Sequence, residues 1–387
     1  MEDFAWLKGR EAAFGAEEFA ARQDRARAAI DAAGHGALIV TAPENIYWLT
    51  GRQTAGYFAF QALILPVTGA PCLLVRQLEL AGARANCWLD HVAVWQDGED
   101  PVDALLALTR KMGISDPAIE RDGWFVAPTQ MARIEGAFGG RLGDGSGIVA
   151  PLRAVKSIAE LKAIRHAARY AEAGLIAGIE TARAGVNENR IAAAMASAAI
   201  SAGSEVWAME PLVSSGPRSG LPHMTWRRRV LETGDGIFIE MAASHARYHA
   251  ALMRSVWIGP PPPAAQAMMT CAEEALAAAL EECRPGNPCS APHASAQAVI
   301  DAAGHTAAFR KRIGYSMGVA FAPDWGEGNI LSLFTGVERV MEPGMVFHLP
   351  ATLRDYGRFT VGVSETVIVT KAGCEPLSTL PRGMTLR

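Results

Sequence analysis

The sequence lacks the features that mark membrane, secreted and nucleic-acid-binding proteins. It has no run of about 18 apolar residues, the length needed to span a bilayer. Its first residues, MEDFAWLKGREAAFGAEEF, are acidic and amphipathic and lack the apolar core of a signal peptide. The net charge is −4 and the pI is near 6.2, so nothing favours nucleic acid or an anionic membrane as a partner. We therefore expect a cytoplasmic protein.

Cysteine and the common metal-binding motifs are also scarce. Six cysteines occur in 387 residues and none forms a CxxC pair, so we interpret them as reduced thiols. The chain contains no HExxH motif, no paired Cys/His spacing and no DxD motif. A hard dinuclear site needs several converging oxygen ligands, and none can be assembled from these residues. The sequence predicts no metal and no other cofactor.

The chain has ample material for a folded core. Half of its residues are hydrophobic and a fifth are charged, as in soluble globular proteins, and 387 residues exceed one ordinary core. Alternating helices and strands up to about residue 150 predict a first α/β domain. Residues 45–51 are rich in aromatic side chains and are interpreted as a turn. The helices are expected at 17–33 and 102–112, and the strands at 36–41, 62–66, 71–75 and 91–95.

The pattern changes around Pro151, where a long helix is predicted at residues 157–183. Ser157 precedes Glu160 by three positions, which is the spacing of a helix capping box. We therefore expect one domain at 1–151 and a second at 152–387. In the second domain the pattern favours further helices at 187–202, 264–283 and 293–303, with strands at 236–241, 256–258, 344–349 and 364–370.

One stretch of the second domain carries a carboxylate where an apolar residue is expected. Residues 236–259 read GIFIEMAASHARYHAALMRSVWIG and predict a β-hairpin, with Glu240 inside its first apolar strand. An unpaired buried carboxylate costs several kcal/mol, so Glu240 requires a partner or a function. A buried ion pair with Arg254 or Arg247 is one interpretation, and a catalytic role is the other.

The segment LRAVKS at residues 152–157, leading into the long helix, resembles the domain junction of the creatinase/prolidase/methionine aminopeptidase superfamily. The resemblance extends over nearly the whole chain. It implies an α/β (α+β) fold in which an N-terminal creatinase-like domain precedes a C-terminal pita-bread domain. Metallopeptidases of this superfamily bind two metal ions through two Asp, one His and two Glu residues. The matching positions here are Glu240, Ala251, Tyr315, Pro350 and Ser364, the last followed by Glu365.

Four of the five ligands are therefore replaced, and the chain resembles the metal-free branch that contains creatinases and ectoine hydrolases. The segment SGPRSGLPH at 215–223 is similar to the creatinase segment that ends in a catalytic histidine, here His223. Creatinases carry acids at the positions of Met253 and Pro350, and a His at Tyr315, which disfavours creatine as substrate. The segments RYH at 247–249, GYSMG at 314–318, PDWGEG at 323–328 and FHLP at 347–350 are similar to ectoine hydrolases instead.

The resemblance implies a metal-independent hydrolase that opens the cyclic amidine of ectoine, and of 5-hydroxyectoine, to an N-acetylated diaminobutyrate. It implies a homodimer that acts on this small compatible solute. Glu240 would attack the amidinium carbon or deprotonate a water, and His223 would protonate the departing nitrogen. Tyr315 would hydrogen-bond the tetrahedral intermediate.

Further residues are candidates for binding the substrate. Arg218 and Arg254 could hold its carboxylate, although Arg254 also fits a structural role behind the hairpin. Trp325 and Tyr57 could pack on the amidinium face. The remaining candidates are Asp324, Glu327 and His348, for which a solvated loop or a satisfied core residue is the alternative.

Two other functions stay open at this level. One is a creatinase-like amidinohydrolase acting on a different small cationic or zwitterionic C–N substrate. The other is a non-catalytic descendant that binds a solute or partner. A protein that had lost catalytic activity would not be expected to retain His223, Glu240 and the PDWGEG segment together, which favours an enzyme.

Overall fold

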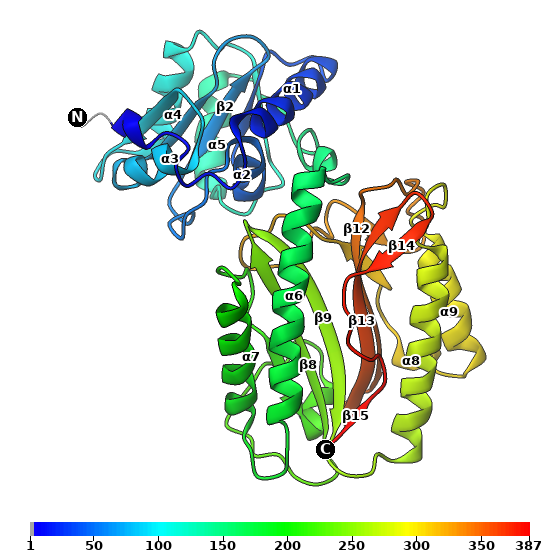
Figure 1. Cartoon of the computed structure of the whole chain (residues 1–387). Helices are drawn as coiled ribbons and strands as arrows, with labels where there is room; N and C mark the ends of the chain where they lie inside the picture. Colours follow the sequence, from blue (N-terminus) through cyan, green and yellow to red (C-terminus); the bar gives the residue numbers. More distant parts are fainter. Residues whose placement is uncertain (1–3) are drawn as a thin grey trace. The chain divides into compact units, whose positions relative to one another are not determined.

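The computed structural model describes residues 4–387 and divides the chain into two compact units. One unit ends at Arg153 and the other runs from Ala154 to Arg387. Both mix helices with β-sheets (Figure 1), as the sequence predicts. Within the described residues, no helix is both long and apolar enough to cross a membrane.

The N-terminal unit is built on a mixed six-stranded sheet with the strand order β4-β3-β2-β1-β5-β6. Helices pack on both faces and bury two apolar clusters around the sheet. The strands are β1 (Ala37–Val40), β2 (Ala62–Pro66), β3 (Cys72–Arg76), β4 (His91–Trp95), β5 (Pro117–Ile119) and β6 (Gly143–Asp144). The helices are α1 (Ala16–Ala32), α2 (Pro43–Thr50), α3 (Leu80–Asn86), α4 (Pro101–Lys111) and α5 (Pro128–Phe138), with short 3-10 turns at Phe4–Leu7, Gln77–Glu79 and Ala150–Arg153.

Helix α2 corrects the prediction of a turn at residues 45–51. Pro43 occupies the first helical position, where its missing N–H costs nothing, and Gly51 ends the helix with a left-handed φ of 85°. The N-cap residue Ala42 has no capping side chain. The buried Glu120 carboxylate takes that role and accepts the Ala42 backbone N–H at 2.9 Å. This long-range cap has no local sequence signal, which is why the pattern looked like a turn.

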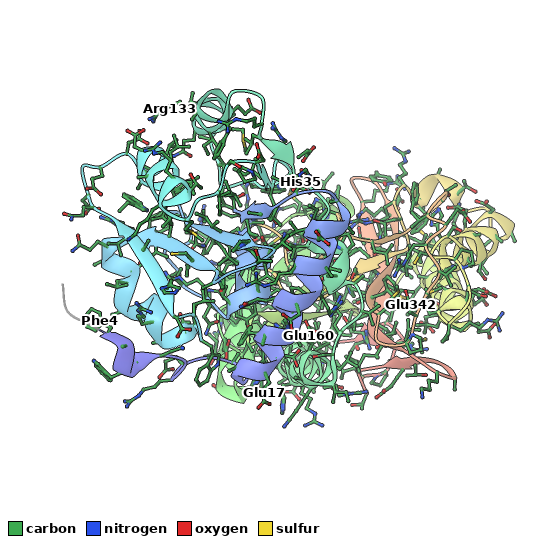
Figure 2. All side chains as sticks on the ribbon, turned by 90° about the horizontal axis from the view of Figure 1, so that it is seen from above. Phe4, Glu17, His35, Arg133, Glu160 and Glu342 are labelled. Atoms are coloured by element: carbon green, nitrogen blue, oxygen red, sulfur yellow. The ribbon has the colours of Figure 1, made fainter. Side chains whose placement is uncertain are left out.

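The surface of the N-terminal unit is held by ordinary ion pairs. Arg133 on α5 forms ion pairs with Asp100 and Asp103 at the start of α4, and Figure 2 labels its side chain. Exposed pairs of this kind contribute little to stability, typically about 0–1 kcal/mol. The buried clusters, and not these pairs, therefore hold the unit together.

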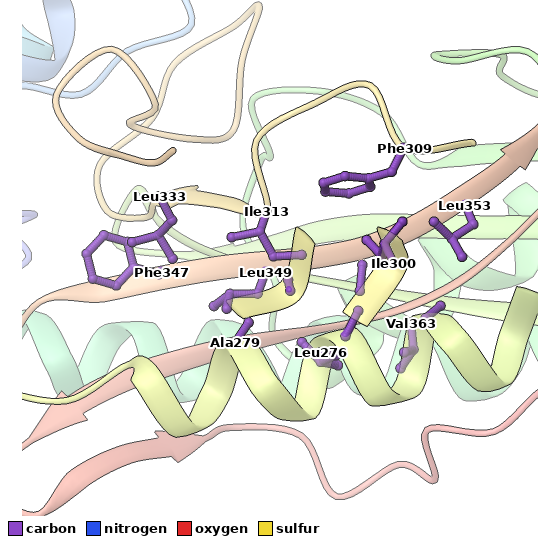
Figure 3. Close-up of a cluster of buried hydrophobic side chains, with 14 of the residues drawn as sticks. Leu276, Ala279, Ile300, Phe309, Ile313, Leu333, Phe347, Leu349, Leu353 and Val363 are labelled. Atoms are coloured by element: carbon purple, nitrogen blue, oxygen red, sulfur yellow. The ribbon is translucent and has the colours of Figure 1, made fainter. Parts of the chain in front are cut away.

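The C-terminal unit contains two sheets, each covered on one side by a pair of helices (Figure 1). Helices α6 (Ile158–Thr181) and α7 (Glu188–Ala202) pack on the four-stranded sheet β15-β9-β8-β7. Helices α8 (Pro263–Glu282) and α9 (Ala291–Ala302) pack on the five-stranded sheet β11-β10-β12-β13-β14. Figure 3 shows Leu276 and Ala279 of α8 against Leu349 of β12.

The strands of this unit form mostly antiparallel ladders, and short turns complete it. The four-stranded sheet contains β7 (Leu212–Ser215), β8 (Gly236–His245), β9 (Tyr248–Trp257) and β15 (Thr385–Leu386). The five-stranded sheet contains β10 (Gly314–Ser316), β11 (Ser332–Leu333), β12 (Val346–Asp355), β13 (Phe359–Thr370) and β14 (Gly373–Pro376). Two 3-10 turns lie at Gly216–Gly220 (η4) and Thr306–Ala308 (η5).

Helix α6 begins at the predicted capping box. The Ser157 hydroxyl accepts the Glu160 N–H at 3.3 Å, and the Glu160 carboxylate accepts the Ser157 N–H at 2.7 Å. The second Glu160 oxygen accepts the Tyr248 hydroxyl at 2.6 Å, and Figure 2 labels Glu160 at this position. The cap therefore also fixes α6 against the first residue of β9.

The predicted hairpin is formed by β8 and β9, with Glu240 opposite Met253 and Ala242 opposite Ala251. Its turn places Ala246 and Arg247 at φ of 50° and 60°, the left-handed pair that a two-residue hairpin turn requires. Both strands extend beyond the predicted bounds. The structure thus confirms the hairpin and fixes which of its residues face each side.

The two sheets of the C-terminal unit meet along β9 and β13 through side-chain hydroxyls. Thr366 Oγ1 accepts the Ala251 N–H at 3.1 Å and donates to the Ala251 carbonyl at 2.8 Å. Ser364 Oγ accepts the Met253 N–H at 2.8 Å. These bonds satisfy backbone groups that would otherwise be orphaned where one sheet ends and the other begins.

Candidate active site

A cavity of about 720 Å³ lies in the C-terminal unit, lined by residues of both sheets. Alternate residues of a strand face the same side, so β8 contributes Phe238 and Glu240, and β12 contributes Pro350, Thr352 and Arg354. The remaining lining residues come from β7, β10 and loops: Met209, Leu212, Pro222, His223, Arg310, Lys311, Arg312, Tyr315, Pro323, Asp324, Trp325 and Tyr356.

Glu240 lies in the cavity wall with 8 % of its surface exposed. Within residues 4–387 its carboxylate accepts no hydrogen bond and forms no ion pair. Arg254 cannot serve as its partner, because its guanidinium contacts Glu365 at 3.1 Å and the Ser364, Leu380 and Pro381 carbonyls. The structure therefore favours the functional interpretation of Glu240 over a buried ion pair with Arg254.

Burial raises the pKa of Glu240, because the enclosed site disfavours its charged form. The positive charges of Lys311 and Arg354 act in the opposite direction and offset only part of this effect. A carboxylate kept in such a position without a fixed partner is a common property of catalytic acids and bases.

His223 lines the cavity just after η4, and its side chain is exposed. Its backbone adopts a φ of 55°, in the left-handed region that non-glycine residues rarely occupy. Strained backbone of this kind clusters at functional sites. The structure thus places His223 at the same cavity as Glu240.

The hydroxyl of Tyr315 belongs to a chain of hydrogen bonds behind the cavity wall. It accepts the Trp325 Nε1–H at 2.9 Å and lies 3.0 Å from His348 Nδ1. His348 Nε2 lies 2.7 Å from Ser364 Oγ. Burial lowers the pKa of His348 to about 3, so its ring is neutral and carries one proton.

The position of that proton follows from the partners of Ser364. Ser364 Oγ already accepts the Met253 N–H, and its own O–H has His348 Nε2 as the acceptor within the described residues. If Nε2 accepts, the proton of His348 sits on Nδ1 and is donated to Tyr315. The Tyr315 oxygen then accepts twice, and its own proton points to the cavity. This arrangement gives a partner to the Trp325 Nε1–H, the His348 ring proton and the Ser364 hydroxyl.

The PDWGEG segment contributes two residues to the cavity lining and one buried residue that fixes the segment. Asp324 and Trp325 line the cavity, and the Asp324 carboxylate accepts the Gly326 N–H at 3.0 Å. Glu327 is buried, pairs with Lys156 at 2.8 Å and accepts the Val319 N–H at 3.1 Å. Glu327 therefore holds the segment in place and is not free to bind substrate.

Close backbone approaches require the glycines around this segment. A Cβ on Gly326 would lie 2.6 Å from the Tyr315 ring, and a Cβ on Gly318 would lie 2.5 Å from the Glu327 carboxylate. Only glycine fits at these positions without displacing Tyr315 or Glu327.

Several predicted binding residues lie away from the cavity lining. Arg218 pairs with the buried Glu188 at 2.5 Å and donates to the Thr225 carbonyl, so its charge is already neutralised. Arg254 and Glu327 are likewise fixed in buried ion pairs, and His348 stands behind Tyr315. These residues are placed as supports, which corrects their prediction as substrate ligands. Tyr57 belongs to the N-terminal unit, where its ring packs edge-on against Phe125 at 5.5 Å.

Sequence reasoning missed the cations of the cavity. They are Arg310, Lys311, Arg312 and Arg354. The first three immediately precede the GYSMG segment, and the fourth lies four residues after Pro350 on the same face of β12. The two-residue period of a strand could have placed Arg354 on the same face as Pro350. Its position in the same cavity as Lys311 depends on the fold and could not be predicted from the sequence pattern.

The residues around Glu240 do not fit a dinuclear metal site. Ala251 and Pro350 have no side-chain donor, and the Tyr315 hydroxyl is held by Trp325 and His348. Nowhere in the part of the chain that the structure describes do three His, Cys, Asp or Glu side chains gather closely enough to hold a metal ion. One carboxylate cannot hold two metal ions.

Two family profiles match the chain. Residues 162–371 match Metallopeptidase family M24, and residues 22–155 match the Creatinase/Prolidase N-terminal domain. Because the first match covers more than half of the chain, the protein belongs to family M24. This confirms the predicted superfamily and its two-part fold, a creatinase-like domain followed by a pita-bread domain.

The individual relatives are hydrolases. The chain is 28% identical to the ectoine hydrolase of Halomonas elongata, over 95% of this chain and 97% of that protein. It is 27% identical to the probable dipeptidase PepE of Mycobacterium tuberculosis, over 95% and 96%. Among solved structures it resembles dipeptidase PepE from Mycobacterium ulcerans (TM-score 0.82, 24% identity, 96% and 99% covered) and prolidase from Thermococcus sibiricus (TM-score 0.85, 21% identity, 96% and 100% covered). The chain is therefore a hydrolase-family member.

Proposed function

We propose that this protein hydrolyses the cyclic amidine ring of ectoine, and of 5-hydroxyectoine, to an N-acetylated diaminobutyrate without a metal ion. The observation that carries the proposal is Glu240, a buried carboxylate that faces a cavity and has no partner within residues 4–387. An amidinium ion supplies the missing positive charge. The similarity to an ectoine hydrolase supports this choice of amidine.

The chemistry needs no Lewis acid, because the amidinium carbon is already electrophilic. Ionised Glu240 either attacks that carbon or removes a proton from a water that attacks it. The new C–O bond gives a tetrahedral intermediate, and the Tyr315 O–H that points to the cavity can stabilise its oxygen. His223 then protonates the departing nitrogen as the C–N bond breaks. One water is consumed and the ring opens.

The direct test is incubation with ectoine after exhaustive chelation, followed by mass spectrometry. We expect a product heavier than ectoine by one water. Creatine and an Xaa-Pro dipeptide serve as controls for the creatinase-like and peptidase alternatives, and we expect no turnover of either. Loss of activity on chelation, with recovery on addition of a divalent metal, would contradict the metal-independent mechanism. No turnover of ectoine by the untreated protein would exclude ectoine as the substrate.

Replacing Tyr315 by Phe tests the hydrogen bond to the intermediate. Removal of one such donor typically lowers kcat by about 10²–10³-fold, and we expect a loss of this size with little change in KM. Tyr356→Phe is the matched control, because Tyr356 also lines the cavity but its side chain is 40% exposed. Equal kcat values for the two variants would show that the Tyr315 hydroxyl does not act in the reaction.

The homodimer remains a proposal that rests on the family resemblance. We expect the purified protein to have twice the mass of one 41.1 kDa chain in light scattering. A mass of one chain at the concentrations used for activity assays would exclude the dimer as the active form.

A further inference from the structure

Four cations line the cavity without an acidic partner. Within residues 4–387, Arg310, Lys311, Arg312 and Arg354 form no ion pair with a carboxylate, and the hydrogen bonds they make go to neutral acceptors. Arg310 donates to the Ala307 carbonyl at 3.1 Å, Lys311 to the Pro350 carbonyl, and Arg312 to Ser332 Oγ at 2.8 Å. Burial lowers the pKa of Lys311 to about 7, but the three arginines alone outnumber the two acids that line the cavity, Glu240 and Asp324.

Three other arginines of this unit form ion pairs with buried or partly buried acids. Arg218, Arg229 and Arg254 contact Glu188, Asp235 and Glu365 at 2.5, 2.5 and 3.1 Å. A partly buried cation is costly unless it is paired, and these three are paired. The cations of the cavity differ from these three and point to an anion that the protein itself does not provide.

Arg354 shows this difference most clearly. Its Nε is enclosed and has no hydrogen-bond partner, and the guanidinium stands in the cavity wall. A guanidinium offers a planar fork of donors that matches a carboxylate. Lys311 lines the same cavity, and its Nζ donates to the Pro350 carbonyl and keeps further donors unused.

The other two cations have different environments. The Arg312 guanidinium lies over the Tyr315 ring at 5.0 Å, and Arg310 lies over the ring of Tyr356 at 4.6 Å. Cation–π contacts of this kind hold a guanidinium against an aromatic face. Lys311 Nζ lies over the Phe309 ring at 5.7 Å, whereas Arg354 has no such contact within the described residues. Arg354, assisted by the unused donors of Lys311, is therefore the cation best able to accept a ligand.

Glu240 and these cations are unpaired in the same cavity, and no ion pair joins them. We propose that Arg354 and Lys311 form an anion subsite, so that the cavity selects amidines that carry a carboxylate on the ring. The carboxylate lies against Arg354 and Lys311, and the amidinium lies against Glu240. This subsite rests on the proposed function and replaces Arg218 and Arg254 as the binding site of the substrate carboxylate.

The subsite excludes simple cationic amidines as well as accepting zwitterionic ones. An amidine without the carboxylate would bring one more positive charge into a cavity that already holds unpaired cations. It would also leave the Arg354 donors without an acceptor. A site built to bind a polar group rejects an analogue that lacks it, because its own buried groups are then left unpaired.

The test compares ectoine with 2-methyl-1,4,5,6-tetrahydropyrimidine, which has the same ring and methyl group but no carboxylate. The wild-type protein, Arg354→Met and Arg354→Lys are compared for kcat/KM on both compounds. Binding of both compounds is measured by calorimetry on the Glu240→Gln background, where no turnover interferes. Arg284→Met is the control, because Arg284 is an exposed cation outside the cavity.

We expect wild type to prefer ectoine by about 10²-fold or more. Arg354→Met should raise KM and Kd for ectoine by a similar factor and leave the compound without the carboxylate unchanged or better bound. Arg354→Lys should recover part of the affinity, because it keeps the charge but not the fork. A melting temperature for each variant separates a folding defect from a binding defect.

Two outcomes would overturn the subsite. One is equal weakening of both compounds in Arg354→Met, and the other is absence of any preference for ectoine in wild type. Failure of the proposed function is distinct, because neither compound would then be hydrolysed. The calorimetric comparison would still decide the subsite, since it requires binding and not turnover: equal Kd values for ectoine with and without Arg354→Met on the Glu240→Gln background correspond to the first of the two outcomes.

Discussion

Glu240→Gln is expected to abolish ectoine hydrolysis, with a fall in kcat of at least about 10³-fold. Glutamine keeps the shape of the side chain but can neither attack the amidinium carbon nor accept a proton from water. No other carboxylate can take over, because Asp324 is the only other acid lining the cavity within the described residues and it already accepts the Gly326 N–H. The measurement is product formation under single-turnover conditions.

The pH dependence of kcat/KM tests the same residue. The proposed reaction needs ionised Glu240, and burial raises the pKa of this residue above the ordinary value of 4.5. Activity should therefore fall as the pH falls, with a midpoint above 4.5. A limb with a midpoint at or below that value would show that Glu240 is not the titrating group.

The same substitution should make the protein more stable at neutral pH. A carboxyl group whose pKa is raised on folding favours the protonated form in the folded state, so its ionisation destabilises the fold above the unfolded-state pKa. Glutamine removes that cost. We expect a higher melting temperature for Glu240→Gln at pH 8 and a smaller difference below pH 4.5, the ordinary value for glutamate.

Glu365→Gln is the matched control for the loss of activity and for the gain in stability that we expect of Glu240→Gln. Glu365 is a buried glutamate of β13, 1% exposed, and it pairs with Arg254 and Arg382. Burial raises the pKa of Glu365 as it does that of Glu240, but Glu365→Gln also leaves the buried Arg254 without its partner. We expect this loss to prevail and destabilise the protein, while turnover in the folded fraction is retained. Opposite changes in stability and activity for the two variants would separate a catalytic from a structural carboxylate.

The sequence predicted the elements that depend on local pattern. The hairpin, the capping box at Ser157 and the covered helices follow from alternation, cap residues and the 3.6-residue period. Glu240 stood out because a carboxylate interrupts an apolar strand. Helix α2 was missed because its N-terminus is capped by Glu120, which lies far along the chain and gives no local signal.

The candidate site was predictable only in part, for a related reason. A single sequence shows which residues could be charged or catalytic, but not which of them already have partners. Arg254 and Arg354 look alike in the sequence, yet one is paired with Glu365 and the other faces the cavity. Pairing across sheets depends on register and layer, and these are properties of the fold.

Lys156→Met is expected to lower the free energy of unfolding by about 3–5 kcal/mol, the usual cost of removing one partner of a buried ion pair. Lys156 Nζ and the Glu327 carboxylate are 2.8 Å apart, and each side chain is 1% exposed. The substitution leaves the Glu327 charge buried next to Ser316. Urea unfolding measures the loss, and Arg339→Met is the control, because its pair with Glu342 is about half exposed and should contribute at most about 1 kcal/mol.

Lys156→Met should lower the catalytic activity as well as the stability. Glu327 fixes the segment that carries Trp325, and Trp325 Nε1 donates to the hydroxyl of Tyr315. A displaced segment would leave Tyr315 free to rotate, so kcat should fall more than KM changes. The double variant Lys156→Met/Glu327→Gln should recover part of the stability, because it no longer buries an unpaired charge. A double variant as unstable as the sum of the two single variants would mean that the two charges do not stabilise one another, and that Glu327 holds the segment through its backbone hydrogen bonds alone.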